Sequence, residues 1–240
     1  MSADRIETLA FVLGIALFEL AERLVPARRV DRRATLRADL AALGMLIVTA
    51  SLCRAGLRAL VDASGLSAPL AGLPFALQAL IGFLVIDLAQ YWLHRAMHAF
   101  APLWRAHAFH HGPHEVHWLS GFRTSVVHAA LFAIPQTLVP HALLGLGPYE
   151  TATGYAVGAL LQLWTHANVR VGGPWLERLL VTPRYHRAHH SSRPDHQRRN
   201  LAMIFPLWDH LFGTWLDPAR ADAERLGLDP PPPPRSWLGL

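Results

Sequence analysis

Long apolar runs constrain the fold of this chain most. They occupy residues 6–25, 40–61, 75–93, 126–145 and 149–165. A helix needs about 20 apolar residues to cross a bilayer. Because 52% of the residues are hydrophobic and only 16% are charged, the chain is too apolar for a typical soluble domain. We therefore predict an all-α integral-membrane helical bundle of about four to five spanning or re-entrant helices, with a cytoplasmic histidine-rich helical cap.

The 240 residues are expected to form a single membrane domain. Its first run has no convincing small-residue cleavage site, so we expect a retained span rather than a removed signal peptide. The domain is divided by composition into N-terminal spans (1–93), a first histidine-rich cap (94–125), a helical hairpin (126–168), a second histidine-rich cap (169–218) and a Pro-rich tail (219–240).

The arginines predict which end of the bundle faces the cytoplasm. Five of them lie in the loop 28–37 and five more between residues 184 and 199, whereas residues 63–72 and 141–150 contain no Lys or Arg. The positive-inside rule then places the basic loops, and the histidines near them, on the cytoplasmic side. Because the basic residues gather at the ends of apolar runs, we expect no nucleic-acid partner.

Eight of the fifteen histidines form three short clusters. The first is an HxxxH pair and the other two are HxxHH triplets, so each presents neighbouring imidazoles on one helix face. A single histidine is more often a satisfied core or surface residue, but the repeated spacing favours metal binding. Eight imidazoles exceed the about four to six ligands of one ion, which predicts two metals. The clusters are His94 and His98, then His107, His110 and His111, then His186, His189 and His190.

Several motifs in order resemble the fatty acid hydroxylase/sterol desaturase superfamily, a group of membrane histidine-rich di-iron oxygenases. The similarity covers roughly residues 87–214. It rests on Asp87 with Tyr91-Trp92-Leu93-His94-Arg95 and His98, on Leu103-Trp104 with His107 and His110-His111, on Gln162 with His166-Ala167-Asn168, on Pro183-Arg184-Tyr185-His186-Arg187 with His189-His190, and on Trp208-Asp209 with Phe212-Gly213-Thr214.

The resemblance implies an oxidoreductase that uses O₂ and two non-haem iron ions to hydroxylate, or desaturate, a C–H bond of a membrane lipid such as a sterol or fatty acyl chain. No catalytic residue is expected beyond the metal ligands. The implied ligands are His94, His98, His107, His110, His111, His166, His186, His189 and His190. The side chains expected to support them are Asp87, Gln162, Asn168, His117, His128 and Asp209.

Two of these supporting side chains carry specific expectations. Asp87 lies seven residues before His94, on the same helix face, where a carboxylate would orient the ligand ring. Gln162 lies one turn before His166 and is expected to contact the metal weakly or through water. Departures from the family pattern occur at Gly112-Pro113-His114, His117 and Thr124-Ser125, around the expected substrate approach.

No dinucleotide-binding glycine fingerprint and no CxxCH motif is present. Electrons must then come from a separate ferredoxin- or cytochrome-type donor with its reductase. The same histidines leave two alternatives open, a membrane metal transporter and a metal-dependent hydrolase, although residues 114–117 do not have the HExxH spacing. The lipid class, and the choice between hydroxylation and desaturation, stay open.

Overall fold

A computed structural model describes residues 2–221, 225–233 and 235–240. Within these residues the secondary structure is helical, with two isolated β-bridges and no strand. This confirms the all-α prediction. Residue 1, at the start of the predicted N-terminal segment, and residues 222–224 and 234, in the predicted Pro-rich tail, lie outside the described residues.

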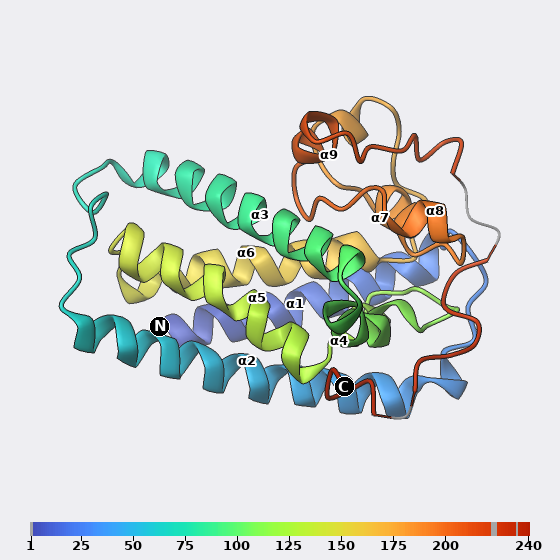
Figure 1. Ribbon diagram of the computed structural model, residues 1–240, viewed down its shortest axis with the longest axis horizontal. Coiled ribbons are helices and arrows are strands. Elements are labelled where there is room, and N and C mark those ends of the chain that lie inside the picture. Colours follow the sequence, from blue (N-terminus) through green and yellow to red (C-terminus); the bar gives the residue numbers. More distant parts are fainter. Residues whose placement is uncertain (1, 222–224, 234) are drawn as a thin grey trace.

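The bundle consists of long helices that run beside one another along the longest axis (Figure 1). Helix α1 packs on α6, and α2 packs on α5. Helix α5 continues past Pro135 and loosens into the π-turn η3 at Pro140, whose ring removes an amide donor. These elements are α1 (Ala3–Leu24), α2 (Leu36–Ser64), α3 (Phe75–Ala99), α5 (Val126–Leu138) with η3 (Val139–Leu143), and α6 (Pro148–His166).

Three of these segments are long and apolar enough to cross a membrane: α2, α3 and α5 with η3. Large apolar side chains cover their outer faces, and Leu52 and Leu60 of α2 are 69% and 68% exposed. Such a continuous apolar surface suits contact with lipid tails. The larger number of about four to five spanning or re-entrant helices stays a prediction.

The helix directions bring the histidine-bearing ends together. Helices α1, α3 and α6 end at one end of the bundle, while the loop 65–74 and the turn 144–147 lie at the other (Figure 1). Gln78 ties that far end together, because its Nε2 donates to the carbonyls of Leu70 and Leu144, both at 3.0 Å. The end of α3, which carries His94 and His98, therefore lies near the end of α6, which carries His166.

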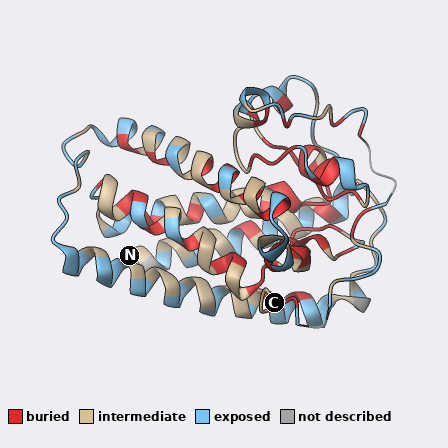
Figure 2. Ribbon diagram, viewed as in Figure 1, coloured by how far each residue is buried: buried red, intermediate tan, exposed pale blue. Residues whose placement is uncertain are grey.

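Short elements form a cap over this end of the bundle. They are α4 (Ala101–His111), α7 (Pro183–His189), α8 (Pro194–Gln197), α9 (Leu207–Leu211) and the 3-10 turns η1 (Arg32–Ala34), η2 (Ser120–Phe122) and η4 (Leu176–Arg178). Buried residues concentrate here, whereas α1 and α2 consist mostly of exposed and partly buried positions (Figure 2). The best-buried part of the molecule is thus the histidine-rich end.

Acidic residues of α1 join the bundle to this cap. Glu22, which is 3% exposed, accepts hydrogen bonds from the backbone amides of Trp118 at 2.8 Å and Asn168 at 2.7 Å. It also pairs with Arg32. The side chain of Glu19 accepts from Trp118 Nε1 at 2.8 Å. The end of α1 is therefore fixed to the loop before η2 and to the segment after α6.

Candidate metal centre

All nine histidines implied as ligands lie at the end of the bundle that the cap covers, and all are buried. They form two groups, and within each group the ring nitrogens that face one another all lie within 4.8 Å. Each group draws on segments far apart in the sequence, so only the folded chain assembles it. The first group is His94, His98, His107, His111 and His189, and the second is His110, His166, His186 and His190.

Each HxxHH triplet is divided between the two groups. In α4, His107 Nε2 lies 3.2 Å from His111 Nε2, whereas His110 Nε2 lies 3.2 Å from His166 Nε2. Neighbouring positions on a helix point about 100° apart, so His110 and His111 diverge. The spacing predicted that His107 lies beside both other rings, and its centroid is 5.2 Å from that of His110 and 4.7 Å from that of His111. The spacing did not predict the division, in which α4 gives two rings to the first group and one to the second.

Helix α7 divides its triplet in the opposite sense. His186 Nε2 and His190 Nε2 lie 3.1 Å apart in the second group. The third ring, His189, faces the first group, with its centroid 4.6 Å from that of His94. The two groups are neighbours, because the rings of His111 and His190 stack across them at 4.5 Å. Helices α4 and α7 thus each contribute rings to both groups.

Backbone carbonyls set the tautomer of three ligand rings. The Nδ1 of His94 lies 2.7 Å from the Leu201 carbonyl, that of His189 lies 2.9 Å from Arg199, and that of His166 lies 3.1 Å from Gln162. A ring that donates its Nδ1 hydrogen to a carbonyl keeps a lone pair on Nε2. These rings therefore aim unprotonated nitrogens into the two groups.

The spacing of these nitrogens fits a metal ion. The Nε2 atoms of His94 and His107 are 3.0 Å apart, and those of His166 and His186 are 2.9 Å apart. Two ligands at right angles, each about 2.1 Å from an ion, lie about 3.0 Å from each other. The buried Nε2 of His189 has no hydrogen-bond partner among the described residues. The donor set fits two metal ions bound by imidazole.

Burial also keeps the rings of the cap in the form that binds metal. Loss of solvent, followed by the neighbouring imidazoles, lowers the pKa of His107, His110 and His111 well below the usual value of 6.5. The same causes lower the pKa of His186 and His190 well below that value. Since only neutral imidazole binds a metal, these rings are ready to act as ligands at neutral pH.

The loop 199–205 supplies two of the three orienting carbonyls, and Asp209 holds it. This carboxylate is fully buried and accepts hydrogen bonds from the amides of Leu201 and Ala202, both at 2.8 Å. It also accepts from Tyr185 Oη at 2.8 Å and from Thr214 Oγ1 at 2.6 Å. Asp209 thus fixes Leu201, whose carbonyl contacts His94, and its support of a metal ligand stays a prediction.

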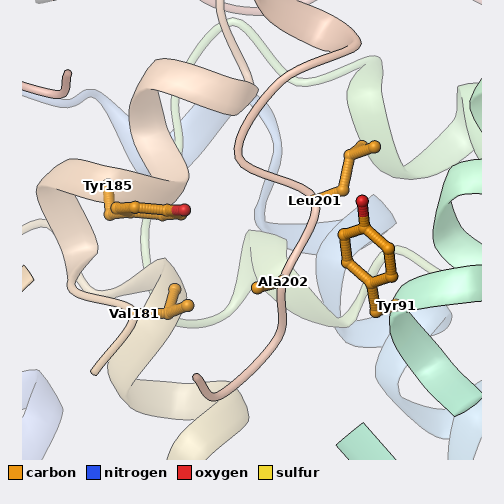
Figure 3. Packing of buried hydrophobic residues seen from close by; sticks show 5 residues of the cluster. All are labelled: Tyr91, Val181, Tyr185, Leu201 and Ala202. Carbon is orange, nitrogen blue, oxygen red and sulfur yellow. The ribbon is translucent and has the colours of Figure 1, made fainter. Parts of the chain in front are cut away.

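Apolar contacts complete the setting of this loop. Leu201 and Ala202 lie between the ring of Tyr91 and that of Tyr185 (Figure 3), and with Val181 they form a buried cluster. The Tyr91 hydroxyl lies 2.8 Å from Thr214 Oγ1, which itself donates to Asp209. The loop is therefore fixed from both sides, which defines the directions of the carbonyls that hold His94 and His189.

Asp87 supports the site less directly than the sequence predicts. It accepts from the amides of Ile204 and Phe205, both at 2.9 Å, and from Trp208 Nε1 at 2.8 Å. No hydrogen bond joins it to a ligand imidazole among the described residues. Its oxygens are occupied by the loop that follows Leu201, so Asp87 positions the loop rather than a histidine ring.

Of the other four supporting side chains, one lies beside an implied ligand and three contact other parts of the chain. His128 lies beside an implied ligand, because its Nδ1 is 3.3 Å from His107 Nδ1, and its supporting role stays a prediction. Gln162 does not reach toward the metal site with its amide, which donates to the Gly121 carbonyl at 2.9 Å. Asn168 exchanges hydrogen bonds with the backbone of Arg28 at 2.8 and 3.1 Å. The ring of His117 lies 3.6 Å from Asp39 Oδ2 on α2. Asn168 and His117 thus hold the bundle to the cap.

Gly121 is a site residue that the sequence did not single out. A Cβ built on it would lie 2.3 Å from His166 Cγ and 2.8 Å from His166 Nδ1. These are closer than van der Waals contact, so the His166 ring needs a residue without a side chain beside it. A glycine in a loop carries no sequence signal of the ring that packs on it.

Gly121→Ala is expected to displace the His166 ring and to weaken metal binding in the second group. A misplaced ligand should lower metal affinity or activity at least about tenfold. Metal content and activity of the purified variant measure this. Gly158→Ala is the matched control, because Gly158 lies on α6 with nothing within 4 Å of the added Cβ. Equal metal content in both variants would contradict the close packing.

His128→Phe tests the contact with His107. Phenylalanine keeps a ring beside Phe132, whose centroid lies 4.6 Å from that of His128, but removes the polar partner of His107. We expect about a 10- to 100-fold loss of metal affinity or activity, typical of an outer partner of a ligand. Competition with a chelator measures the affinity, and His210→Phe on the exposed side of α9 is the control. An unchanged metal affinity in His128→Phe would show that His128 does not support His107.

The nine histidines and their supports lie within one stretch that matches known proteins. A family model described as fatty acid hydroxylase matches residues 79–214. The chain is 33% identical over 156 residues to the ornithine lipid hydroxylase OlsE of Rhizobium tropici (65% of this chain, 46% of that protein). It is 35% identical over 136 residues to the alkylglycerol monooxygenase of Danio rerio (56% and 30%).

A third relative is the Delta(7)-sterol-C5(6)-desaturase of Nicotiana tabacum, 31% identical over 158 residues (64% of this chain, 55% of that protein). The chain thus spans less than two thirds of the length of each of these proteins. No solved structure matches it. The family match covers more than half of the chain and confirms the resemblance seen in its motifs: the chain belongs to the fatty acid hydroxylase family.

Proposed function

We propose that this chain is an O₂-dependent di-iron oxygenase that hydroxylates, or desaturates, a C–H bond of a membrane lipid such as a sterol or fatty acyl chain. The observation that carries the proposal is the pair of adjacent, buried, all-imidazole groups at one end of an apolar bundle. The names of the relatives agree with it, since they are a lipid hydroxylase, an alkylglycerol monooxygenase and a sterol desaturase.

In this proposal the nine histidines hold two iron ions, five rings on one and four on the other. Imidazole suits iron among the first-row metals. When bound, two redox-active irons supply the electrons for O₂ reduction and the oxidising power for C–H cleavage, which no protein side chain provides. The chain itself keeps the rings neutral and in place, through burial and through the carbonyls of Leu201, Arg199 and Gln162.

Two features favour this proposal over the alternatives. A metal transporter needs polar ligands along a path through the membrane, whereas the nine histidines gather in two adjacent groups at one end of the bundle. A metal-dependent hydrolase needs a base near its metal-bound water. The buried carboxylates that hold the loop 199–205, Asp87 and Asp209, already accept three and four hydrogen bonds. Neither is placed to act as that base.

The histidine end is proposed to face the cytoplasm, because the basic loop between α1 and α2 lies at that end. Reducing electrons would come from a ferredoxin- or cytochrome-type protein with its own reductase. Exposed arginines at this end would attract an acidic partner and speed its association. Such steering weakens as salt increases, so the rate of reduction by the donor should fall with ionic strength.

Lipid profiling of cells that express the chain tests the proposal. The matched control is His186→Ala, which removes one ring of the second group. We expect one lipid class to gain one oxygen, or to lose two hydrogens, only with the unaltered chain and only in the presence of O₂. Purified protein should contain iron. An iron-loaded chain that leaves every lipid unchanged, or that yields the products of hydrolysis, would contradict it.

A further inference from the structure

The Pro-rich tail runs across the histidine end of the molecule and packs on it. Residues 225–233 and 235–239, called the strap below, pass from the segment after α7 to the start of α5 (Figure 1). Leu226 and Ser236 in the strap are each only 4% exposed. The family match ends at residue 214. The strap is therefore a packed part of this chain that lies outside the stretch shared with the family model.

The strap first pairs with the segment that carries His190. The amide of Gly227 donates to the His190 carbonyl at 3.1 Å, and the amide of Ser192 donates to the Arg225 carbonyl at 3.0 Å. The two hydrogen bonds form a short antiparallel bridge. Since His190 is a ring of the second group, the strap holds the backbone of one implied ligand directly.

The same part of the strap packs on the loop that begins where the α4 triplet ends. His114 Nδ1 lies 2.9 Å from the Leu226 carbonyl, and the Leu226 side chain forms a buried cluster with Val116. Gly227 has a φ of +85°, and a Cβ built on it would lie 2.7 Å from the Pro113 carbonyl oxygen. Glycine suits such a left-handed and closely packed position. The turn at Gly227 thus fixes the loop after α4 to the strap.

The other end of the strap fixes the start of α5. The amide of Val126 donates to the Trp237 carbonyl at 2.9 Å. Between the two ends, Pro232 packs so closely on Gly112 that a Cβ built on the glycine would lie 2.9 Å from the proline ring. The start of α5 carries His128, whose ring lies beside a ligand of the first group. The strap therefore joins three segments that surround the two groups.

A buried ion leaves its site only when the segments that bear its ligands open. The free energy of such a local opening rises with the number of packed contacts and hydrogen bonds that break. Helices α4 and α7 supply rings to both groups, and the strap contacts the chain directly after the triplet of each helix. Opening either segment therefore breaks contacts with the strap.

We propose that the strap is a positioning segment that closes the metal centre and slows the exchange of its metal. It acts through the backbone of His190 and through the loop after α4, and none of its side chains is among the nine implied ligands. The inference rests on the proposed metal centre but not on the oxygenase reaction. Because linkage is reciprocal, a strap that retains bound metal must itself be held closed by bound metal.

Gly227→Val is expected to open the strap at its tightest point. A β-branched residue rarely adopts the φ of +85° and would meet the Pro113 carbonyl. The full-length variant, loaded with Fe²⁺ without oxygen, should release iron to a chelator at least about tenfold faster than the unaltered chain, which corresponds to about 1.4 kcal/mol. Gly65→Val is the matched control, because Gly65 has a φ of +64° with nothing within 4 Å of an added Cβ and lies in the loop at the far end of the bundle.

Leu226→Ala is a second variant that adds no backbone strain. It shortens the side chain that packs on Val116, and it should release iron at least about threefold faster than the unaltered chain, since loss of a packed side chain destabilises the closed strap. The melting temperatures of the metal-free variants separate local opening from loss of the whole fold.

Trypsin measures the reciprocal effect in the unaltered chain. Arg225 and Arg235 are exposed residues in the strap, and cleavage after them should be at least about tenfold slower with iron bound than without it. Cleavage after Arg5, at the start of α1, should not change.

The two measurements also separate this inference from the metal centre itself. Iron release that is equally fast in the unaltered chain, Gly227→Val and Leu226→Ala would overturn the strap alone, as would strap cleavage that iron does not slow. An unaltered chain that holds no iron would overturn the metal centre, and the role of the strap with it.

Discussion

His110→Ala and His111→Ala are expected to remove different metal ions, although the two residues are adjacent. His111 belongs to the group of five rings and His110 to the group of four. Loss of one ligand from a buried site should cost at least about 100-fold in activity, because even partners of ligands cost 10- to 100-fold. Each single variant should retain about one iron per chain instead of the proposed two.

Double variants make this test independent of the overall loss of activity. His110→Ala with His166→Ala removes two rings from one group, so about one iron should remain. His110→Ala with His111→Ala removes one ring from each group, so both irons should be weakened or lost. Iron analysis after anaerobic purification measures the difference, and His210→Ala serves as the surface control. Loss of both irons in the first pair, or retention of one strong site in the second, would contradict the division into groups.

Asp209→Ala is expected to be the most destabilising single change in the cap. It leaves the amides of Leu201 and Ala202 and the hydroxyls of Tyr185 and Thr214 without their acceptor. Buried donors without a partner cost about 1–3 kcal/mol each, so a loss of at least about 3 kcal/mol is expected. Because the Leu201 carbonyl orients His94, metal affinity should fall as well.

Thermal unfolding in detergent and chelator competition measure the two effects of Asp209→Ala. Asp217→Ala is the control, because Asp217 accepts a hydrogen bond from the exposed amide of Ala219 and pairs with the exposed Arg220. A melting temperature and a metal affinity like those of the control would show that the loop 199–205 keeps its position without the carboxylate. That result would remove the orienting role given to Asp209.

The sequence predicted the helical fold and three histidine clusters because both depend on local patterns, whereas the set of nine histidines, with His166, came from the resemblance to the family. Apolar runs identify long helices, and HxxxH or HxxHH spacing places imidazoles on helices. The division of each triplet depends on how α4 and α7 meet, which the spacing alone does not encode. His110 and His111 look equivalent in the sequence and yet face different groups.

The supporting contacts were harder to predict for a related reason. Backbone carbonyls, such as those of Leu201 and Arg199, have no residue type, so nothing in the sequence marks them as partners of ligand rings. Asp87 has the right spacing from His94 but turns to the loop 204–205, because two backbone amides lie there. Gly121 matters only because His166 packs against it. Apart from the contact between His189 and Arg199, which are ten residues apart, each contact joins segments far apart in the chain.

X-ray absorption at the iron edge, combined with iron analysis of anaerobically prepared protein, tests the central claim most directly. The account predicts two irons per chain, with an average of four to five imidazole nitrogens around each, as the two histidine groups provide. It also predicts no sulfur neighbour, since the one cysteine, Cys53, lies on α2 outside both groups. A single metal ion, or iron surrounded by few nitrogens, would contradict it.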